Sequence, residues 1–140
     1  MSRSIEALLV EARAARRAGR ADEARETYDR TRLAARDAGR PLLEGDALRH
    51  LSDLDREAAR REQALSAAEQ AVTLYETADR PLDLANSLRL KALALEGLMS
   101  RTDARPAWIR ARDLYAAAAV ADGVAECEER LRRWSPAPGP

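Results

Sequence analysis

The sequence predicts an all-α protein, an α-solenoid of three antiparallel helix pairs followed by one capping helix. Ala, Leu, Arg and Glu dominate the chain of 140 residues, which contains no Phe, and these residues favour helices. Apolar residues recur three and four positions apart in seven successive stretches, which is the spacing of a helix that buries one face. The tetrapeptide GRPL at residues 39–42 returns as DRPL at residues 79–82. A return at this distance indicates a repeat of about forty residues.

Two helices are expected in the first forty residues, at about 2–18 and 22–38. The first stops at Gly19, and the second begins at acidic residues that favour a helix N-terminus. Gly39 then ends the second helix in a left-handed conformation, and Pro41 fits the first turn of the next helix because an N–H is not needed there. The GRPL motif is therefore interpreted as a hinge between antiparallel helices.

The remaining helices are expected at about 41–59, 61–78, 81–100, 102–118 and 121–134. The helix at 81–100, which includes Met99 in its stripe, is apolar nearly all round and should lie between neighbours. Thr102 or Asp103 is expected to cap the next helix, with Pro106 in its first turn. The final SPAPGP is too rich in Pro to be structured by itself.

When the three forty-residue segments are superposed, several positions carry the same kind of residue in all three. We expect these positions to lie on packed faces. The aligned sets are Leu8, Leu48 and Leu88; Ala24, Ala64 and Ala104; Ala38, Ala78 and Ala118; and the small residues Ala12, Ser52 and Ala92. Ala58 is expected to be buried with its helix. The alignment predicts one domain over residues 1–134, with repeats at about 1–40, 41–80 and 81–120, a capping helix at 121–134 and a Pro-rich disordered tail at 135–140.

The second helix of each pair resembles that of the tetratricopeptide repeat. That resemblance lies in an Ala, a residue four positions later and a small residue three positions after that: Ala24, Tyr28, Thr31; Ala64, Ala68, Ala71; Ala104, Trp108, Ala111. The chain departs from the family pattern at Glu11 and Lys91, where Leu is usual, and at Ala68, where a bulky residue is usual. The period of forty is similar to the long variant of kinesin light chains, and HEAT repeats share this length.

The resemblance implies a right-handed superhelix with a concave groove lined by the first helix of each pair. The residues it places there are Arg13, Arg16 and Arg17; Asp46, Arg49, His50, Asp53 and Arg56; and Asn86, Arg89, Leu90 and Leu93. We expect the groove to bind an extended or helical peptide with acidic and apolar side chains, because Arg pairs with carboxylates and Leu supplies apolar contact. The alternative is that these arginines form a solvated face with helical ion pairs. Asn86 and Arg89 do not fit the register of the family's carboxylate clamp.

Charge and composition argue against several other partners. Lys and Arg balance Asp and Glu at 24 each, so the basic surface that nucleic acid or an anionic membrane requires is not expected. The single Cys127 fits a reducing compartment, and the chain is expected to be cytoplasmic. With one His and one Cys, we expect no metal site and no cofactor. No residue pattern assigns catalytic roles, and the acidic residues near the end, such as Glu126, are typical of a solvated surface.

The sequence therefore predicts a non-catalytic module for protein–protein interaction, a scaffold or adaptor. The second hypothesis is a self-assembling structural protein, a homo-oligomer, suggested by the apolar helix at 81–100, the zero net charge and Trp134 at the end of the last helix. Trp134 is equally open to an anchoring role for a partner. An enzyme is the third and least supported reading.

Overall fold

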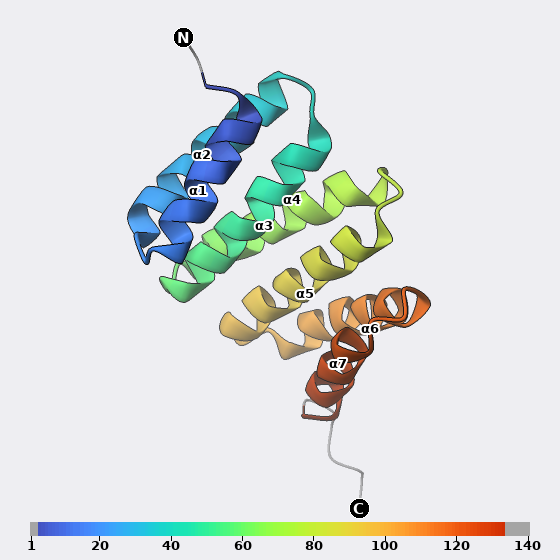
Figure 1. Cartoon of the computed structure of the whole chain (residues 1–140). Coiled ribbons are helices and arrows are strands. Elements are labelled where there is room, and N and C mark those ends of the chain that lie inside the picture. The colour runs from blue at the N-terminus through green and yellow to red at the C-terminus, as the bar shows by residue number, and fades with distance from the viewer. Residues whose placement is uncertain (1–2, 134–140) are drawn as a thin grey trace, which may run out of the picture.

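A computed structural model describes residues 3–133, which form seven α-helices and contain no strand (Figure 1). The helices are α1 (Ile5–Arg17), α2 (Ala21–Asp37), α3 (Pro41–Glu57), α4 (Arg61–Glu76), α5 (Pro81–Gly97), α6 (Arg101–Ala117) and α7 (Ala121–Arg133). Each helix packs against the next one along the chain. None of the helices in this range is long and apolar enough to cross a bilayer.

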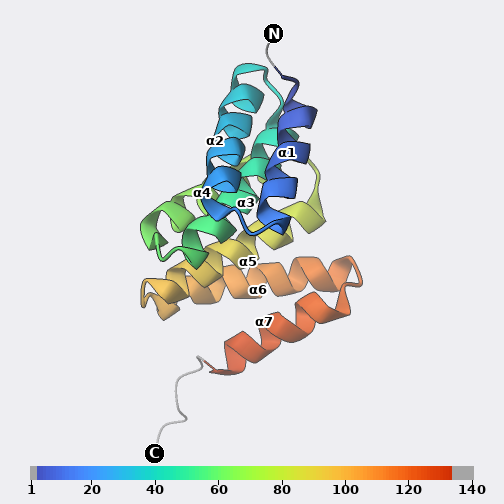
Figure 2. The same ribbon diagram turned by 60° about the vertical axis from the view of Figure 1, so that its left-hand side comes forward.

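The helices are layered so that α1 and α7 lie at opposite ends of the molecule (Figures 1 and 2). Ion pairs also join each odd-numbered helix to the next one. Arg13 of α1 lies 2.9 Å from Asp46 of α3, and Arg49 of α3 lies 3.5 Å from Asp83 of α5. Arg89 of α5 pairs in turn with Glu126 of α7. The odd-numbered helices therefore share a continuous polar face.

The connections between the helices follow one design. Residues with positive φ stand twenty positions apart: Gly19, Gly39, Ala59, Asp79, Met99 and Ala119. At the first, the Gly19 N–H donates to the Arg16 carbonyl at 3.0 Å and the Arg20 N–H to the Ala15 carbonyl at 2.9 Å, a pattern that closes a helix C-terminus. The predicted left-handed Gly39 is confirmed, with φ 65°, and Pro41 is the first residue of α3.

The core is built mainly from Ala and Leu, packed with a few aromatic rings. Ala24, Ala64 and Ala104 are fully buried, as their alignment predicted. Two helix glycines allow still closer approach, because a Cβ at Gly45 would lie 2.7 Å from the Tyr75 ring and one at Gly123 would lie 2.5 Å from the Tyr115 ring. The absence of a side chain at these two positions brings α3 against α4 and α7 against α6.

The prediction of buried residues is wrong at the helix ends. Ala38, Ala58 and Ala118 were expected on packed faces but are exposed C-caps, because each helix stops one residue earlier. Met99, expected in the apolar stripe of its helix, lies in the left-handed turn after α5 and is 76% exposed. Apolar periodicity continues past these ends in the sequence, but the backbone reverses direction there.

The start of α6 also differs from the prediction. The helix begins at Arg101, so Thr102 and Asp103 belong to it and Ser100 occupies the N-cap position. Pro106 consequently lies inside the helix and not in its first turn. The Ser100 hydroxyl donates to the Asp103 carboxylate at 2.6 Å, which orders the first turn without capping a backbone N–H.

The expectation that the fifth helix lies between neighbours is confirmed. Helix α5 contacts α3, α4 and α6, and most of its apolar residues are buried in these contacts. Its apolar surface is therefore used within the chain and gives no support for self-assembly. Two further expectations concerned the role of Trp134 and the disordered tail at 135–140. These residues lie outside the described part of the chain.

Candidate binding groove

Two adjoining hollows on the odd-numbered helices gather most of the residues expected in a groove. The first, of about 350 Å³, is lined by Arg13, Arg16, Arg17, Tyr28 and His50. The second, of about 140 Å³, is lined by Arg49, His50, Asp53, Asn86, Arg89 and Leu90. His50 lines both hollows, whose residues come from α1, α2, α3 and α5, and the two together are called the groove below. Asp46, Arg56 and Leu93, also expected there, line neither hollow.

His50 is fixed at the centre of this groove. Its ring stacks on Tyr28 of α2, with 4.5 Å between the ring centroids and 7° between the planes. Arg16 lies 2.9 Å from His50 Nδ1 and must donate, since a guanidinium cannot accept. Burial lowers the pKa of His50, and the nearby arginines lower it further against the opposing charge of Asp46. The imidazole is therefore neutral at pH 7, with its proton on Nε2, 3.7 Å from the Asp46 carboxylate.

Most of the arginines expected in the groove already have acidic partners. Arg13 and Arg49 share Asp46, at 2.9 and 3.1 Å, and Arg56 pairs with Asp53 at 2.8 Å. Arg16 reaches the Glu57 carboxylate at 3.3 Å in addition to its bond with His50. Among residues 3–133, Arg17 is the groove arginine that has no hydrogen-bond or ion-pair partner.

The α5 end of the groove is tied to the last two helices. Arg89 donates to both oxygens of Glu126 on α7, at 2.5 and 3.1 Å, and these bonds raise the pKa of Arg89. Asn86 accepts a hydrogen bond of 2.6 Å from the Tyr115 hydroxyl, and burial raises the pKa of Tyr115 to about 12. Asn86 and Arg89 therefore hold α5, α6 and α7 together.

The two leucines expected in the groove are mostly covered. Leu90 is 5% exposed and contributes apolar surface to the second hollow, whereas Leu93 is 9% exposed and faces the packed interior. The apolar character of the groove is thus concentrated near Leu90 and the stacked rings.

Three buried polar atoms near the groove lack a hydrogen-bond partner within the described part of the chain: the Tyr28 hydroxyl, Arg49 Nε and Arg56 Nε. Buried donors are usually satisfied by protein or by water. Arg49 and Arg56 each use another guanidinium nitrogen to bond Asp46 and Asp53.

Sequence reasoning missed two elements of the groove. The partner of Arg89 is Glu126, 37 positions later, and no local spacing connects them. Tyr28 was recognised as a packed residue, but its stacking on His50 depends on how α2 and α3 cross. The alignment carries a partial signal, because His50 takes the place of Val10 and Leu90.

Cys127 of α7 lies in the core and lines neither hollow. It is fully buried, and burial raises the pKa of its thiol to about 11, so it is protonated at neutral pH. Within residues 3–133, no three His, Cys, Asp or Glu side chains are grouped so that they could hold a metal ion.

Comparison with known proteins adds no family to this description. No protein-family model matches the chain, and no curated protein is significantly similar to it.

Proposed function

We propose that this protein is a non-catalytic binding module that holds a peptide or helix with acidic and apolar side chains in the groove between α1, α3 and α5. The observation that carries the proposal is the pair of hollows that meet at His50, lined by arginines on one side and bounded by Leu90 on the other. Such a groove suits a ligand whose carboxylates alternate with apolar groups.

Arg17 is the first contact proposed for an acidic ligand. Its guanidinium is exposed and has no partner among the described residues, so it can pair with a carboxylate without breaking an existing bond. Arg13 and Arg16 lie within the same hollow but are engaged by Asp46 and Glu57. A ligand carboxylate would exchange with these acids, which adds selectivity but little net affinity.

The fixed geometry of the groove favours binding. The stacking of Tyr28 on His50 and the bond from Arg16 to His50 order these side chains before a ligand arrives. Pre-ordering of this kind reduces the conformational entropy lost on association.

We also propose the finer architecture that this role requires, a tetratricopeptide-like solenoid of the pairs α1–α2, α3–α4 and α5–α6 with α7 as the cap. The twenty-residue spacing of the left-handed turns and the ion pairs between odd-numbered helices support it. A scaffold or adaptor of this kind would act in the cytoplasm, where a free cysteine stays reduced.

Selection from a displayed library of random peptides tests the function. Enrichment of peptides that combine Asp or Glu with Leu is expected, and Arg17→Gln should weaken their binding about five- to tenfold through the loss of one charged contact. Arg36→Gln, at an exposed position near the end of α2, is the matched control and should leave binding unchanged. Enrichment without an acidic preference, or equal binding by both variants, would contradict the proposal.

A further inference from the structure

At each end of the molecule, some exposed residues align with residues that are buried in the middle of the fold. At one end, Val10 of α1 is 65% exposed. The residues aligned with it at intervals of forty are His50, which stacks on Tyr28 of the preceding pair, and Leu90, which lines the second hollow together with residues of α3. Among the described residues no helix pair precedes α1, so Val10 makes no equivalent contact there.

The whole outer stripe of α1 shares this property. Ala7 and Ala14 are exposed on the same face as Val10, at helical spacing. Their aligned residues in α3 and α5 are all buried: Ala47, Leu54, Ser87 and Ala94. This outer stripe, defined as Ala7, Val10 and Ala14, therefore resembles a helix-packing face for which residues 3–133 provide no partner.

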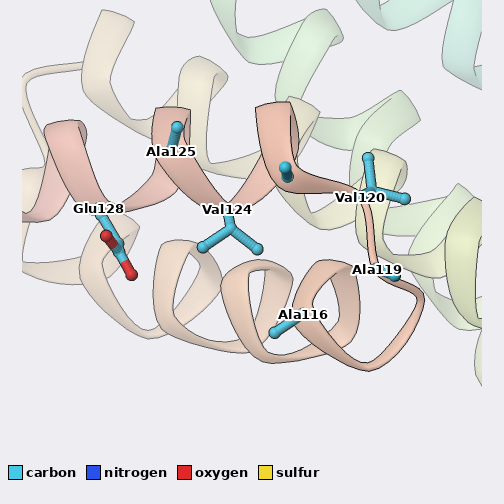
Figure 3. A pocket seen from close by; sticks show the side chains of 7 residues that line it. Ala116, Ala119, Val120, Val124, Ala125 and Glu128 are labelled. Carbon is cyan, nitrogen blue, oxygen red and sulfur yellow. The ribbon is translucent and has the colours of Figure 1, made fainter.

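A cleft of about 400 Å³ lies at the opposite end, between α6 and α7. It is lined by Ala116, Ala119, Val120, Ala121, Val124, Ala125 and Glu128. Figure 3 shows Val124 between the two helices and Glu128 at one end of the cleft. Apart from Glu128, every side chain lining the cleft is a small apolar one.

Some of the residues that align with those of the cleft are covered by neighbouring helices in the earlier repeats. Ala125 aligns with Gly45 and Ala85, which are buried in α3 and α5, and Gly45 lies directly against Tyr75 of the following helix. Val124 aligns with the buried Leu84. Among residues 3–133 no helix follows α7, and none of their helices covers this face.

We propose that a second copy of this chain fills the cleft with the outer stripe of its α1, so that molecules join end to end. The two surfaces match in character, because the outer stripe consists of Ala and Val and the cleft is lined by Ala and Val with one Glu. Their charges also match: Arg17 continues the outer stripe and Glu128 borders the cleft, and neither has a partner among residues 3–133.

The contact is between unlike surfaces, so each bound copy presents a new free end. An unlike contact of this kind generates open chains unless a rotation closes a ring. Arg17 also lines the first hollow, so this contact and a ligand in the groove compete for its guanidinium. The proposal does not depend on the groove having the ligand class proposed above.

Sedimentation velocity over a concentration series tests the contact. The wild-type chain should show a weight-average mass that rises with concentration and passes the dimer without a plateau. Val10→Glu and Ala125→Glu each place a charge on one surface, at exposed positions, and each should leave a monomer. Leu33→Glu, at an exposed position of α2 outside both surfaces, should associate like the wild type.

Mixing the two blocked variants gives the decisive result. Val10→Glu retains a working cleft and Ala125→Glu retains a working outer stripe, so the mixture should form a 1:1 dimer and nothing larger. A wild-type chain that is monomeric at every concentration would overturn the proposal. So would a dimer that Ala125→Glu abolishes and Val10→Glu leaves intact, which indicates symmetric pairing of α7, or association that neither variant changes.

Discussion

Tyr28 and His50 stack with their rings nearly parallel, 4.5 Å between centroids, and this contact joins α2 to α3 at the centre of the candidate groove. Stacking fixes the imidazole plane, so that Nδ1 faces Arg16 and Nε2 faces Asp46. One aromatic pair thus orders two charged residues of the groove. Because His50 is the sole histidine of the chain, its titration can be followed without overlap.

Stability should decrease in acid through His50. Burial lowers its folded pKa, so below the usual value of about 6.5 the unfolded chain binds a proton that the folded chain excludes. The stabilisation that comes from the neutral His50 is complete above that pH. It decreases as the pH falls through 6.5 toward the folded pKa, by at most about 1.4 kcal/mol per pH unit. Urea unfolding at several pH values, compared with His50→Gln, isolates the effect. Parallel curves for the two proteins would contradict the prediction.

The buried Asp55 should be a strong contributor to stability. It accepts from Arg25 at 2.6 Å and from Arg60 at 2.9 Å, which ties α2 to the end of α3. Asp55→Asn removes the charge that both arginines contact. Because these arginines are partly exposed and can be rehydrated, the expected loss is about 1–3 kcal/mol in the free energy of unfolding. Asp113→Asn, at a side chain 66% exposed, should change it by less than about 0.5 kcal/mol.

Glycine should be preferred at the left-handed turns that lack it. Ala59 and Ala119 have φ of 61° and 58°, values that an Ala side chain disfavours. Ala59→Gly and Ala119→Gly are expected to stabilise the protein by about 0.5–1 kcal/mol each, and Gly19→Ala to destabilise it by about 1 kcal/mol. Denaturant unfolding measures all three. Opposite signs at the alanine positions would show that other contacts determine these turns.

Three helix glycines should respond differently to the same substitution. Gly45→Ala and Gly123→Ala force a methyl group against Tyr75 and Tyr115, and overpacking of this kind costs about 1–3 kcal/mol. At Gly97 the nearest atom, in the flexible side chain of Arg61, is 3.7 Å away, so Gly97→Ala should instead stabilise α5 by up to about 1 kcal/mol. Thermal unfolding of the three variants provides the comparison. Equal effects would rule out close helix approach as the reason for glycine.

Local signals in the sequence predicted much of the fold. Gly39 and Pro41 marked a turn and a helix start correctly, and the Ala columns at 24, 64 and 104 identified core positions. Met99 was misplaced because nothing in its type indicates a left-handed turn, and its strain is tolerated only because the flanking helices pack. Apolar periodicity describes which face is buried, but not where the backbone turns.

The groove was predicted less completely than the fold. Helical spacing placed Arg13, Arg16 and Arg17 on one stripe, and these residues do line one hollow. It could not indicate that Asp46 and Glu57 would neutralise two of them, because those pairs join different helices. Pairing across helices depends on side-chain geometry that a single sequence does not encode locally.

Binding of an acidic and apolar peptide at His50 can be followed by the NMR signal of the single imidazole during titration with a peptide that combines Glu and Leu. We expect a saturable shift of the His50 resonance, weakened by Arg17→Gln and absent with a peptide in which Lys replaces Glu. Binding that leaves the His50 resonance unmoved, or no binding at all, would contradict this expectation.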